Sequence, residues 1–384
     1  MASFRYFKVI FTTLILMSIW GTGFFTANAA VERKPINHVF LISVGGLNRE
    51  GFVSNPTPNM KYLMLEGAAS DKILAIRSDT MEAAEASLLT GAMPEAHKHL
   101  TVNDKVEVES IFDLLKKNGK SVLTVDGTGG KLYSFAYGEK EYLKLEAHSS
   151  SKVIMEEGFK RFSQNKPFFS YLYIDECSDA LLRQDQDAYY HAIRNFDTQL
   201  GVFLKKIKDN GLLDTSLIIV TSARSSSPSN LVPLIICGPG CNVNTGINGG
   251  MIIDIAATIC RLTTMEPTAA SRGLPLYGAL TVSEEERQSF NADWIKDLQK
   301  DRQANWNGLY RLEDELGRTV RQMASIKEEK QSVFDFAGER EQLIIGLKSK
   351  LTVERAIIAA VLLLMMGGYF VEYIILKKKF LLFK

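Results

Sequence analysis

The sequence lacks a strong excess of charge and has few residues of the types that build metal sites. Its 45 basic and 44 acidic residues give a formal net charge of +1, so no overall charge attracts nucleic acid or acidic substrates. It has five histidines, and no spacing of cysteine with histidine is typical of a zinc site. No internal repeat or low-complexity tract is visible. With 46% hydrophobic and 23% charged residues, the composition is that of a globular protein, and 384 residues suffice for two units.

Cysteine is also scarce, with four in the chain. A chain of this length can bury a sizeable core without disulfides. Cys237 and Cys241 flank a Gly-Pro-Gly turn that a small disulfide could close, and free buried thiols are the equal alternative. With Cys177 and Cys260 included, the four cysteines allow three connectivities, and the sequence does not choose among them.

The first 30 residues predict a signal peptide. Arg5 and Lys8 form a basic region before the apolar run at 9–20, and residues 27–29 read Ala-Asn-Ala, a small-residue cleavage site. An uncleaved N-terminal anchor is the alternative.

A second apolar segment, at 354–376, predicts a membrane-spanning helix. It contains the roughly 20 apolar residues that are needed to cross the hydrocarbon core of a bilayer. The tail at 377–384 begins with three lysines, which by the positive-inside rule places this end in the cytoplasm. Together with the signal peptide, this segment predicts a single-pass membrane protein of the cell envelope, with its globular domain outside the cytoplasm.

The segment 31–282 alternates between strand-like and helix-like patterns. Helical spacing of apolar residues occurs at 108–118 and 187–210. Apolar runs rich in Val, Ile, Phe and Tyr predict buried strands at 38–44, 121–125, 168–174, 216–221 and 232–236. This alternation predicts an α/β domain with a mainly parallel sheet and helices on both faces.

Strand patterns end near residue 284, and the segment 283–353 predicts a helical stalk. Up to residue 350 this segment is rich in charged residues and contains no proline. A heptad seam comprises Leu309, Leu312, Leu316, Met323 and Ile326, and an apolar stripe resumes at Leu343, Leu347 and Leu351. This pattern predicts a helical or coiled-coil stalk, and a helical hairpin packed on the α/β domain is the alternative.

The order of segments in the α/β domain resembles the alkaline phosphatase superfamily, especially its phosphodiesterase, nucleotide pyrophosphatase and sulfatase-like branches. The segments that carry the resemblance are 38–47 (HVFLISVGGL), 87–97 (SLLTGAMPEAH), 195–222 and 232–240 (VPLIICGPG). The resemblance implies the fold of that superfamily. Its active members use two divalent metals, commonly zinc, to activate a Thr or Ser nucleophile and to stabilise a transferring phosphoryl or sulfuryl group.

Most residues that the resemblance would require for the two metals are replaced. Asp179 is the one expected ligand that the sequence retains. Glycine and alanine cannot coordinate a metal, and the fixed charge of arginine repels one. The replaced positions are Gly45 (metal-binding aspartate), Met81 (nucleophile, with Thr80 one residue out of register), Ala84 (polar donor), Arg183 (histidine), Ala223 and Arg224 (Asp-His pair) and Asn248 (last histidine).

These losses predict a pseudoenzyme that serves as a binding or scaffold module and has no cofactor. Its expected partners are the membrane and an envelope protein or a second copy of the stalk, with no nucleic acid. One alternative is a phosphate- or sulfate-ester hydrolase or transferase with two zinc ions and a rearranged site built from Ser78, Thr80, Asp179 and the two arginines. A further alternative is a structural protein whose stalk self-associates.

Three smaller features complete the site hypotheses. Arg183 and Arg224 could form an anion-binding pocket, and the alternative is that they pair with Asp179 and Glu85. His97 and His99 have a spacing that could suit a metal, and a structural role is the favoured interpretation. The glycine-rich stretch at 126–130 lacks the spacing of a phosphate-binding loop and predicts a turn.

Overall fold

The computed structural model describes residues 34–135, 142–225, 227 and 229–381. The chain divides into an α/β unit up to Arg287 and a helical unit from Gln288. The predicted signal peptide at 1–30 lies outside the described residues.

The described part of the α/β unit contains one sheet of eight strands, in the order β4-β3-β5-β1-β6-β7-β2-β8. The strand β7 is antiparallel to its neighbours β6 and β2, and every other pair of neighbours is parallel. The predicted mainly parallel sheet is therefore confirmed. The strands are β1 (His38–Val44), β2 (Ala68–Leu74), β3 (Val122–Asp126), β4 (Tyr142–Lys144), β5 (Phe169–Ile174), β6 (Ser216–Thr221), β7 (Leu231–Cys237) and β8 (Thr245–Gly246).

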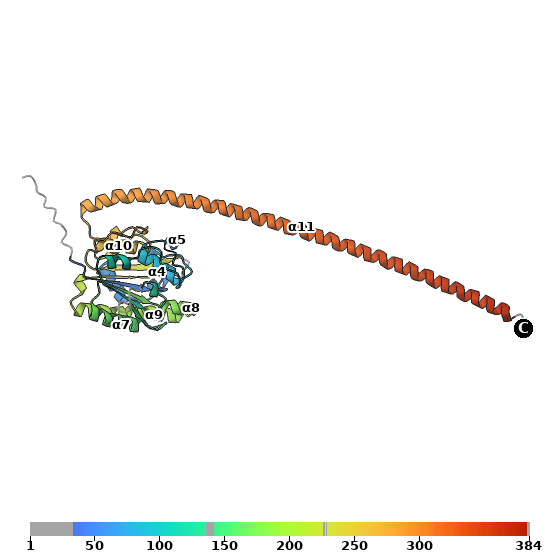
Figure 1. Ribbon diagram of the computed structural model, residues 1–384, viewed down its shortest axis with the longest axis horizontal. Coiled ribbons are helices and arrows are strands. Elements are labelled where there is room, and N and C mark those ends of the chain that lie inside the picture. The colour runs from blue at the N-terminus through green and yellow to red at the C-terminus, as the bar shows by residue number, and fades with distance from the viewer. Residues whose placement is uncertain (1–33, 136–141, 226, 228, 382–384) are drawn as a thin grey trace, which may run out of the picture. The chain divides into compact units, whose positions relative to one another are not determined.

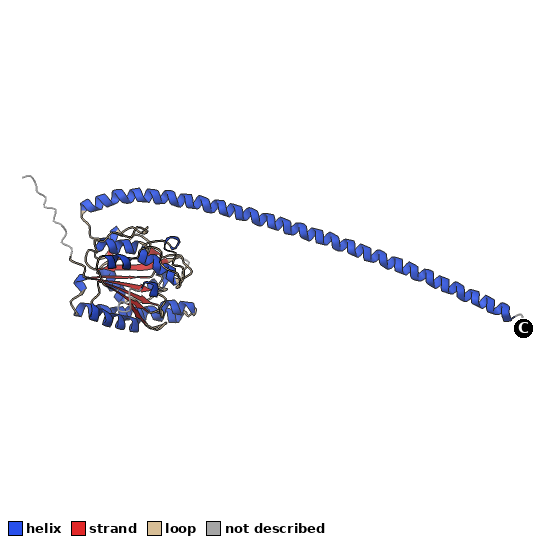
Figure 2. Ribbon diagram, viewed as in Figure 1, coloured by secondary structure: helices blue, strands red, loops and turns tan. Residues whose placement is uncertain are grey.

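Helices cover both faces of this sheet, as predicted (Figures 1 and 2). Side chains of β1 alternate between two cores: Val39 and Leu41 pack with α4, α6 and α10, whereas Phe40 and Ile42 pack with α2, α3, α7 and α9. The helices are α2 (Arg49–Ser54), α3 (Pro58–Leu65), α4 (Met81–Thr90), α5 (Pro94–His97), α6 (Ile111–Lys117), α7 (Ser151–Asn165), α8 (Glu176–Leu182), α9 (Gln186–Asp209) and α10 (Asp254–Leu262), with 3₁₀ turns η1 (Tyr133–Phe135), η2 (Leu213–Thr215) and η3 (Tyr277–Ala279).

Local chemistry explains where the helix α6 begins and why the strand β2 was among the elements that the sequence did not predict. The helix α6 starts at Ile111, later than predicted, because Ser110 and Asp113 form a capping box. The strand β2 has no continuous apolar run, since Asp71 and Lys72 lie in its middle, at an irregularity in its pairing with β7. Its buried residues are the small Ala68, Ala69 and Ser70, with Ile73 as the one large apolar side chain among them, so periodicity alone did not reveal it.

The helix α11 (Glu284–Leu381) is continuous over 98 residues. The predicted stalk is thus helical, and the alternative of a helical hairpin is wrong for residues 284–381, because no turn interrupts them. Residues 311–381 include a stretch that is long and apolar enough to cross a membrane. The predicted span at 354–376 lies within these residues, and the last residues of the basic tail, 382–384, lie outside the described part.

Candidate functional site

The candidate site lies beyond the carboxyl ends of neighbouring parallel strands, the edge where open α/β sheets usually bind ligands. The loop after β1 begins with Gly45, β5 leads into α8 through Asp175, and β6 leads into Ala223 and Arg224. A cavity of about 110 Å³ brings together three of the predicted positions, Gly45, Met81 and Arg224. Its other lining residues are Gly46, Glu85, Tyr173, Ser178, Leu181 and Leu182.

At Gly45, the aspartate position, the Tyr173 hydroxyl occupies the space that a side chain would need. A β-carbon at residue 45 would lie 2.9 Å from Tyr173 Cζ and would overlap Tyr173 Oη. Tyr173 is 1% exposed on β5, so it cannot swing into solvent without opening the core. Because β1 and β5 are adjacent and parallel, glycine at one strand end accommodates a large side chain from the other.

Glu85 is a fully buried acid beside this cavity. Its carboxylate accepts a 2.8 Å hydrogen bond from Ser43 Oγ and a 2.6 Å hydrogen bond from Tyr171 Oη. Burial raises the pKa of Glu85 to about 7, although the two hydroxyl donors act in the opposite direction. The partners of Glu85 are therefore neutral hydroxyl groups on β1 and β5, and it makes no ion pair with Arg224.

The retained acid, Asp179, already has two basic partners. Its carboxylate lies 2.9 Å from His148 Nδ1 and 2.9 Å from an Arg183 guanidinium nitrogen. Arg183 follows α8 and its side chain is 62% exposed, so the two residues form an ion pair one helical turn apart at the surface. Pairing with Asp179 was the alternative to an anion-binding role for Arg183, and the structure contains this pair. Burial raises the pKa of the neighbouring Asp175 to about 6.

The remaining predicted positions supply no metal ligand. Ala84 and Ala223 are completely buried in the core between the sheet and α4. Asn248 is exposed in the loop after β8. No group of three or more His, Cys, Asp or Glu side chains within the described residues could hold a metal ion. Together with Tyr173 over Gly45, this set of side chains does not fit the two divalent metals that the superfamily uses.

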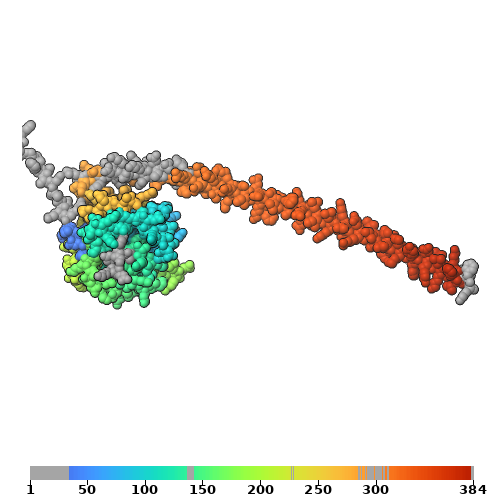
Figure 3. Space-filling model, viewed as in Figure 1, coloured from blue at the N-terminus to red at the C-terminus, as the bar shows by residue number. Residues whose placement is uncertain are grey.

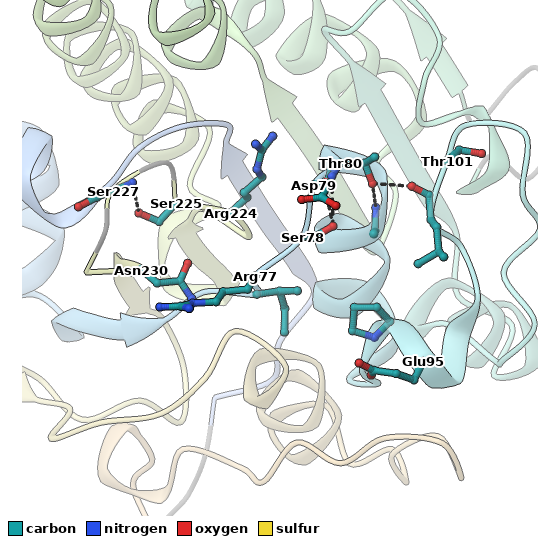
Figure 4. Close-up of a pocket in the computed structure, with 14 residues that line it drawn as sticks. Arg77, Ser78, Asp79, Thr80, Glu95, Thr101, Arg224, Ser225, Ser227 and Asn230 are labelled. Carbon is teal, nitrogen blue, oxygen red and sulfur yellow. Dashed lines mark hydrogen bonds between the residues drawn. The ribbon is translucent and has the colours of Figure 1, made fainter. Parts of the chain in front are cut away.

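A larger cavity, of about 950 Å³, adjoins the first through Arg224, which lines both (Figure 4). The loop after β2 contributes Arg77 and Asp79, and α5 contributes Glu95. None of these four charged side chains forms a hydrogen bond or an ion pair with any described residue. The other lining residues are Ile76, Ser78, Thr80, Ala83, Pro94, Leu100, Thr101, Ser225, Ser227 and Asn230.

Thr80 borders this cavity at the start of α4. Its hydroxyl caps the helix by accepting a 3.3 Å hydrogen bond from Ala83 N, and it donates a 2.5 Å hydrogen bond to Leu100 O. Ser78 Oγ donates a 3.0 Å hydrogen bond to Thr80 O. Among the described residues, no histidine or acid contacts the Thr80 hydroxyl, so the geometry provides no base that would activate it.

His97 and His99 have structural partners. His97 Nε2 lies 3.0 Å from Ser87 Oγ, and its Nδ1 accepts a 3.1 Å hydrogen bond from His99 N. His99 Nδ1 lies 2.7 Å from Asp104 O. Burial lowers the pKa of His97 to about 4, which keeps its ring neutral.

The turn at 126–130 and the cysteines also have structural roles. Asp126 is buried and accepts hydrogen bonds from Thr128 N at 2.7 Å, Leu132 N at 3.1 Å and Tyr142 Oη at 2.5 Å. The stretch is thus a turn organised by its own carboxylate, as predicted. All four cysteines lie within the described residues as free, buried thiols, so the Cys237–Cys241 disulfide is not formed.

No protein-family model and no curated protein sequence matches the chain. Solved structures do match it. The lipoteichoic acid synthase LtaP from Listeria monocytogenes is 18% identical, with a TM-score of 0.51 over 64% of this chain and 76% of that one. Murine ectonucleotide pyrophosphatase/phosphodiesterase 5 is 13% identical, with a TM-score of 0.52 over 60% of this chain and 96% of that one. A Vibrio parahaemolyticus protein in the alkaline phosphatase superfamily is 20% identical, with a TM-score of 0.53 over 65% and 71%. At these identities the likeness shows a shared fold.

Proposed function

We propose that this chain, which has the fold of the alkaline phosphatase superfamily, is a membrane-anchored pseudoenzyme whose α/β unit binds a ligand or partner outside the cytoplasm. The expected fold is confirmed, whereas function depends on the site. The observation that carries the proposal is the packing of the Tyr173 hydroxyl against Gly45, because it occupies the space that a ligand side chain would need.

The surrounding residues support the loss of metal chemistry. Met81 and Arg224 line the same small cavity, and neither side chain is a ligand for zinc. Glu85 is held by Ser43 and Tyr171, and Asp179 is held by His148 and Arg183. Glu85 and Asp179 therefore already have partners within the chain.

The larger cavity is the proposed binding site. Arg77 and Arg224 come from loops that follow two different strands, and guanidinium groups bind phosphate, sulfate and carboxylate groups through paired hydrogen bonds. Neither arginine has a partner among the described residues. In Figure 4, Glu95 lies on one side of the cavity, and Ser225 and Ser227 lie on the opposite side. Because the carboxylate of Glu95 repels an anion, we expect an anionic group to bind near the two serines.

The anchoring part of the proposal rests on α11 and on the sequence of both ends. The helix contains one stretch apolar enough to span a membrane, and three lysines follow the predicted span. The positive-inside rule then places the tail in the cytoplasm and the α/β unit on the other side.

Metal content and turnover test the pseudoenzyme proposal. The purified full chain should contain less than about a tenth of an equivalent of metal by ICP-MS, because the site residues have no suitable donor set. It should also hydrolyse no phosphodiester or sulfate ester with added zinc or manganese. Near-stoichiometric metal, or turnover that depends on Thr80, would instead establish the hydrolase or transferase alternative.

A further inference from the structure

The helix α11 carries a long apolar seam with a seven-residue repeat. Leu347 and Leu351 follow Leu312 and Leu316 by 35 residues, which is five heptads. Because α11 is continuous, the two apolar stretches seen in the sequence belong to one register. With Leu316 at position a, the a and d positions from 312 to 351 are Leu312, Leu316, Thr319, Met323, Ile326, Lys330, Val333, Ala337, Arg340, Ile344, Leu347 and Leu351.

Every residue of this seam is exposed in α11, the helix that runs from orange to red in Figure 3. Leu316, Met323, Ile326 and Leu347 are each more than 60% exposed. They precede the predicted span at 354–376, so lipid does not cover them. An apolar stripe of this length in water is unfavourable, and long helices with such a stripe normally pair with another helix.

The side of the helix directly opposite the seam is polar. Opposite it, the f positions are Asp314, Arg321, Glu328, Asp335, Gln342 and Ser349. All of these are polar, as expected for the water-facing side of a coiled coil. Lys330, in the middle of the seam at an a position, is the kind of polar residue that fixes register and limits the number of strands.

We propose that α11 pairs with α11 of a second copy of this chain, in parallel and in register, to form a two-stranded coiled coil over residues 312–351. Parallel pairing rests on the proposed single-pass anchoring: copies inserted by the same span enter one membrane in one orientation and to one depth. Identical a and d positions then meet at the same height, as a parallel homodimer requires. The interface is isologous and closes with two copies.

The area of the seam approaches that of a specific dimer interface. Residues 312–351 extend for about 60 Å at the α-helical rise of about 1.5 Å per residue. A contact strip about 10 Å wide over this length is roughly 600 Å² in projection, and the accessible area of its side chains is larger. Specific interfaces bury about 800 Å² per partner, so the seam alone approaches this size.

Cysteine cross-linking of the full chain in its membrane tests the proposal. Ile344→Cys and Leu347→Cys place thiols in the seam, whereas Gln342→Cys and Ser349→Cys place them on the opposite side of the same turns. The four native cysteines are buried, so they contribute little background. Mild oxidation should convert the two seam variants to disulfide-linked dimers at least about ten times faster than the two outer variants.

Equal cross-linking at all four positions, or cross-linking at none, would overturn the proposal. The mass of the full chain in detergent provides a second measurement. It should correspond to two copies, and Leu316→Glu combined with Leu347→Glu should reduce it to one. A single copy for the unmodified chain, or a mass of three or more copies, would contradict the two-stranded assembly. These results do not depend on metal content or turnover, so this proposal and the pseudoenzyme proposal can fail separately.

Discussion

The hydroxyl of Tyr173 fills the space into which a side chain at Gly45 would project. The two residues lie 128 positions apart in the chain, at the ends of the adjacent strands β1 and β5. A metal-binding side chain at residue 45 and a buried Tyr173 are therefore mutually exclusive in this packing. The space that a side chain at residue 45 would need is occupied by another part of the core.

This packing predicts a specific cost for a side chain at residue 45. Gly45→Ala should lower the free energy of unfolding by about 1–3 kcal/mol, because the added methyl group overpacks the core. In a Tyr173→Phe background the cost should fall by roughly 1 kcal/mol, since the overlapping hydroxyl is gone. Urea denaturation of the full chain in detergent measures both values.

Gly249→Ala is the matched control, because a β-carbon at that position meets no atom within 4 Å. Gly249→Ala should change the free energy of unfolding by less than about 0.5 kcal/mol. Additive effects of Gly45→Ala and Tyr173→Phe would contradict the proposed contact.

Glu85 predicts a component of stability that depends on pH. Its pKa in the fold, about 7, lies above the ordinary value of 4.5, so the folded state binds the proton more tightly than the unfolded chain. The contribution of Glu85 to the free energy of unfolding is fully present below about pH 4.5, and it is lost as the pH rises towards 7. Relative to Glu85→Gln, the wild-type protein should therefore lose up to ~3 kcal/mol of unfolding free energy between pH 4.5 and 8.

Comparison with the variant isolates Glu85 from Asp175, which titrates in the same window and is present in both proteins. Glu107→Gln, at an exposed acid, should show no such difference from wild type across this range. A constant difference between wild type and Glu85→Gln from pH 4.5 to 8 would show that the carboxyl group does not hold its proton in the fold.

The two arginines singled out in the sequence should behave differently. Isothermal titration with inorganic phosphate, sulfate and nucleotides should detect an anion that binds the larger cavity. Arg224→Ala should weaken this binding about 10- to 100-fold, the usual loss for a charge-assisted hydrogen bond. Arg183→Ala is the matched control and should have little effect, because Arg183 pairs with Asp179 and lines neither cavity.

Equal weakening by both substitutions would place the anion elsewhere. An absence of heat with every probe at millimolar concentration would refute the anion-binding part of the proposed function, and it would leave the metal and cross-linking results unaffected.

Asp126 predicts a stability effect that is unconnected with ligands. Asp126→Asn should lower the free energy of unfolding by roughly 2–4 kcal/mol, because an amide cannot accept from all of the buried donors that Asp126 serves. Tyr142→Phe removes one of these donors and should cost less. Thermal unfolding of the two variants compares their losses of unfolding free energy. A larger loss for Tyr142→Phe than for Asp126→Asn would contradict this prediction.

Much of this architecture could be predicted from the sequence because its signals are local. The strands β1 and β6 have the predicted limits, since continuous apolar runs between polar residues define them. The candidate membrane span follows from the length of one apolar run, and the heptad seam of α11 follows from periodicity within a single segment. By contrast, β2 was missed because the register with β7, and not its own sequence, makes it a strand.

By itself, the sequence determined which residue types stand at the positions that the resemblance matches, and from these residue types it predicts that most of the expected metal ligands are replaced. Only the tertiary structure decided which contacts these residues make. Tyr173 meets Gly45, Glu85 meets Ser43 and Tyr171, and Arg224 faces the cavities while Arg183 pairs with Asp179 at the surface. Most of these contacts join residues that are far apart in the chain, and their geometry is set by the pairing of β1, β5 and β6, which no local pattern encodes.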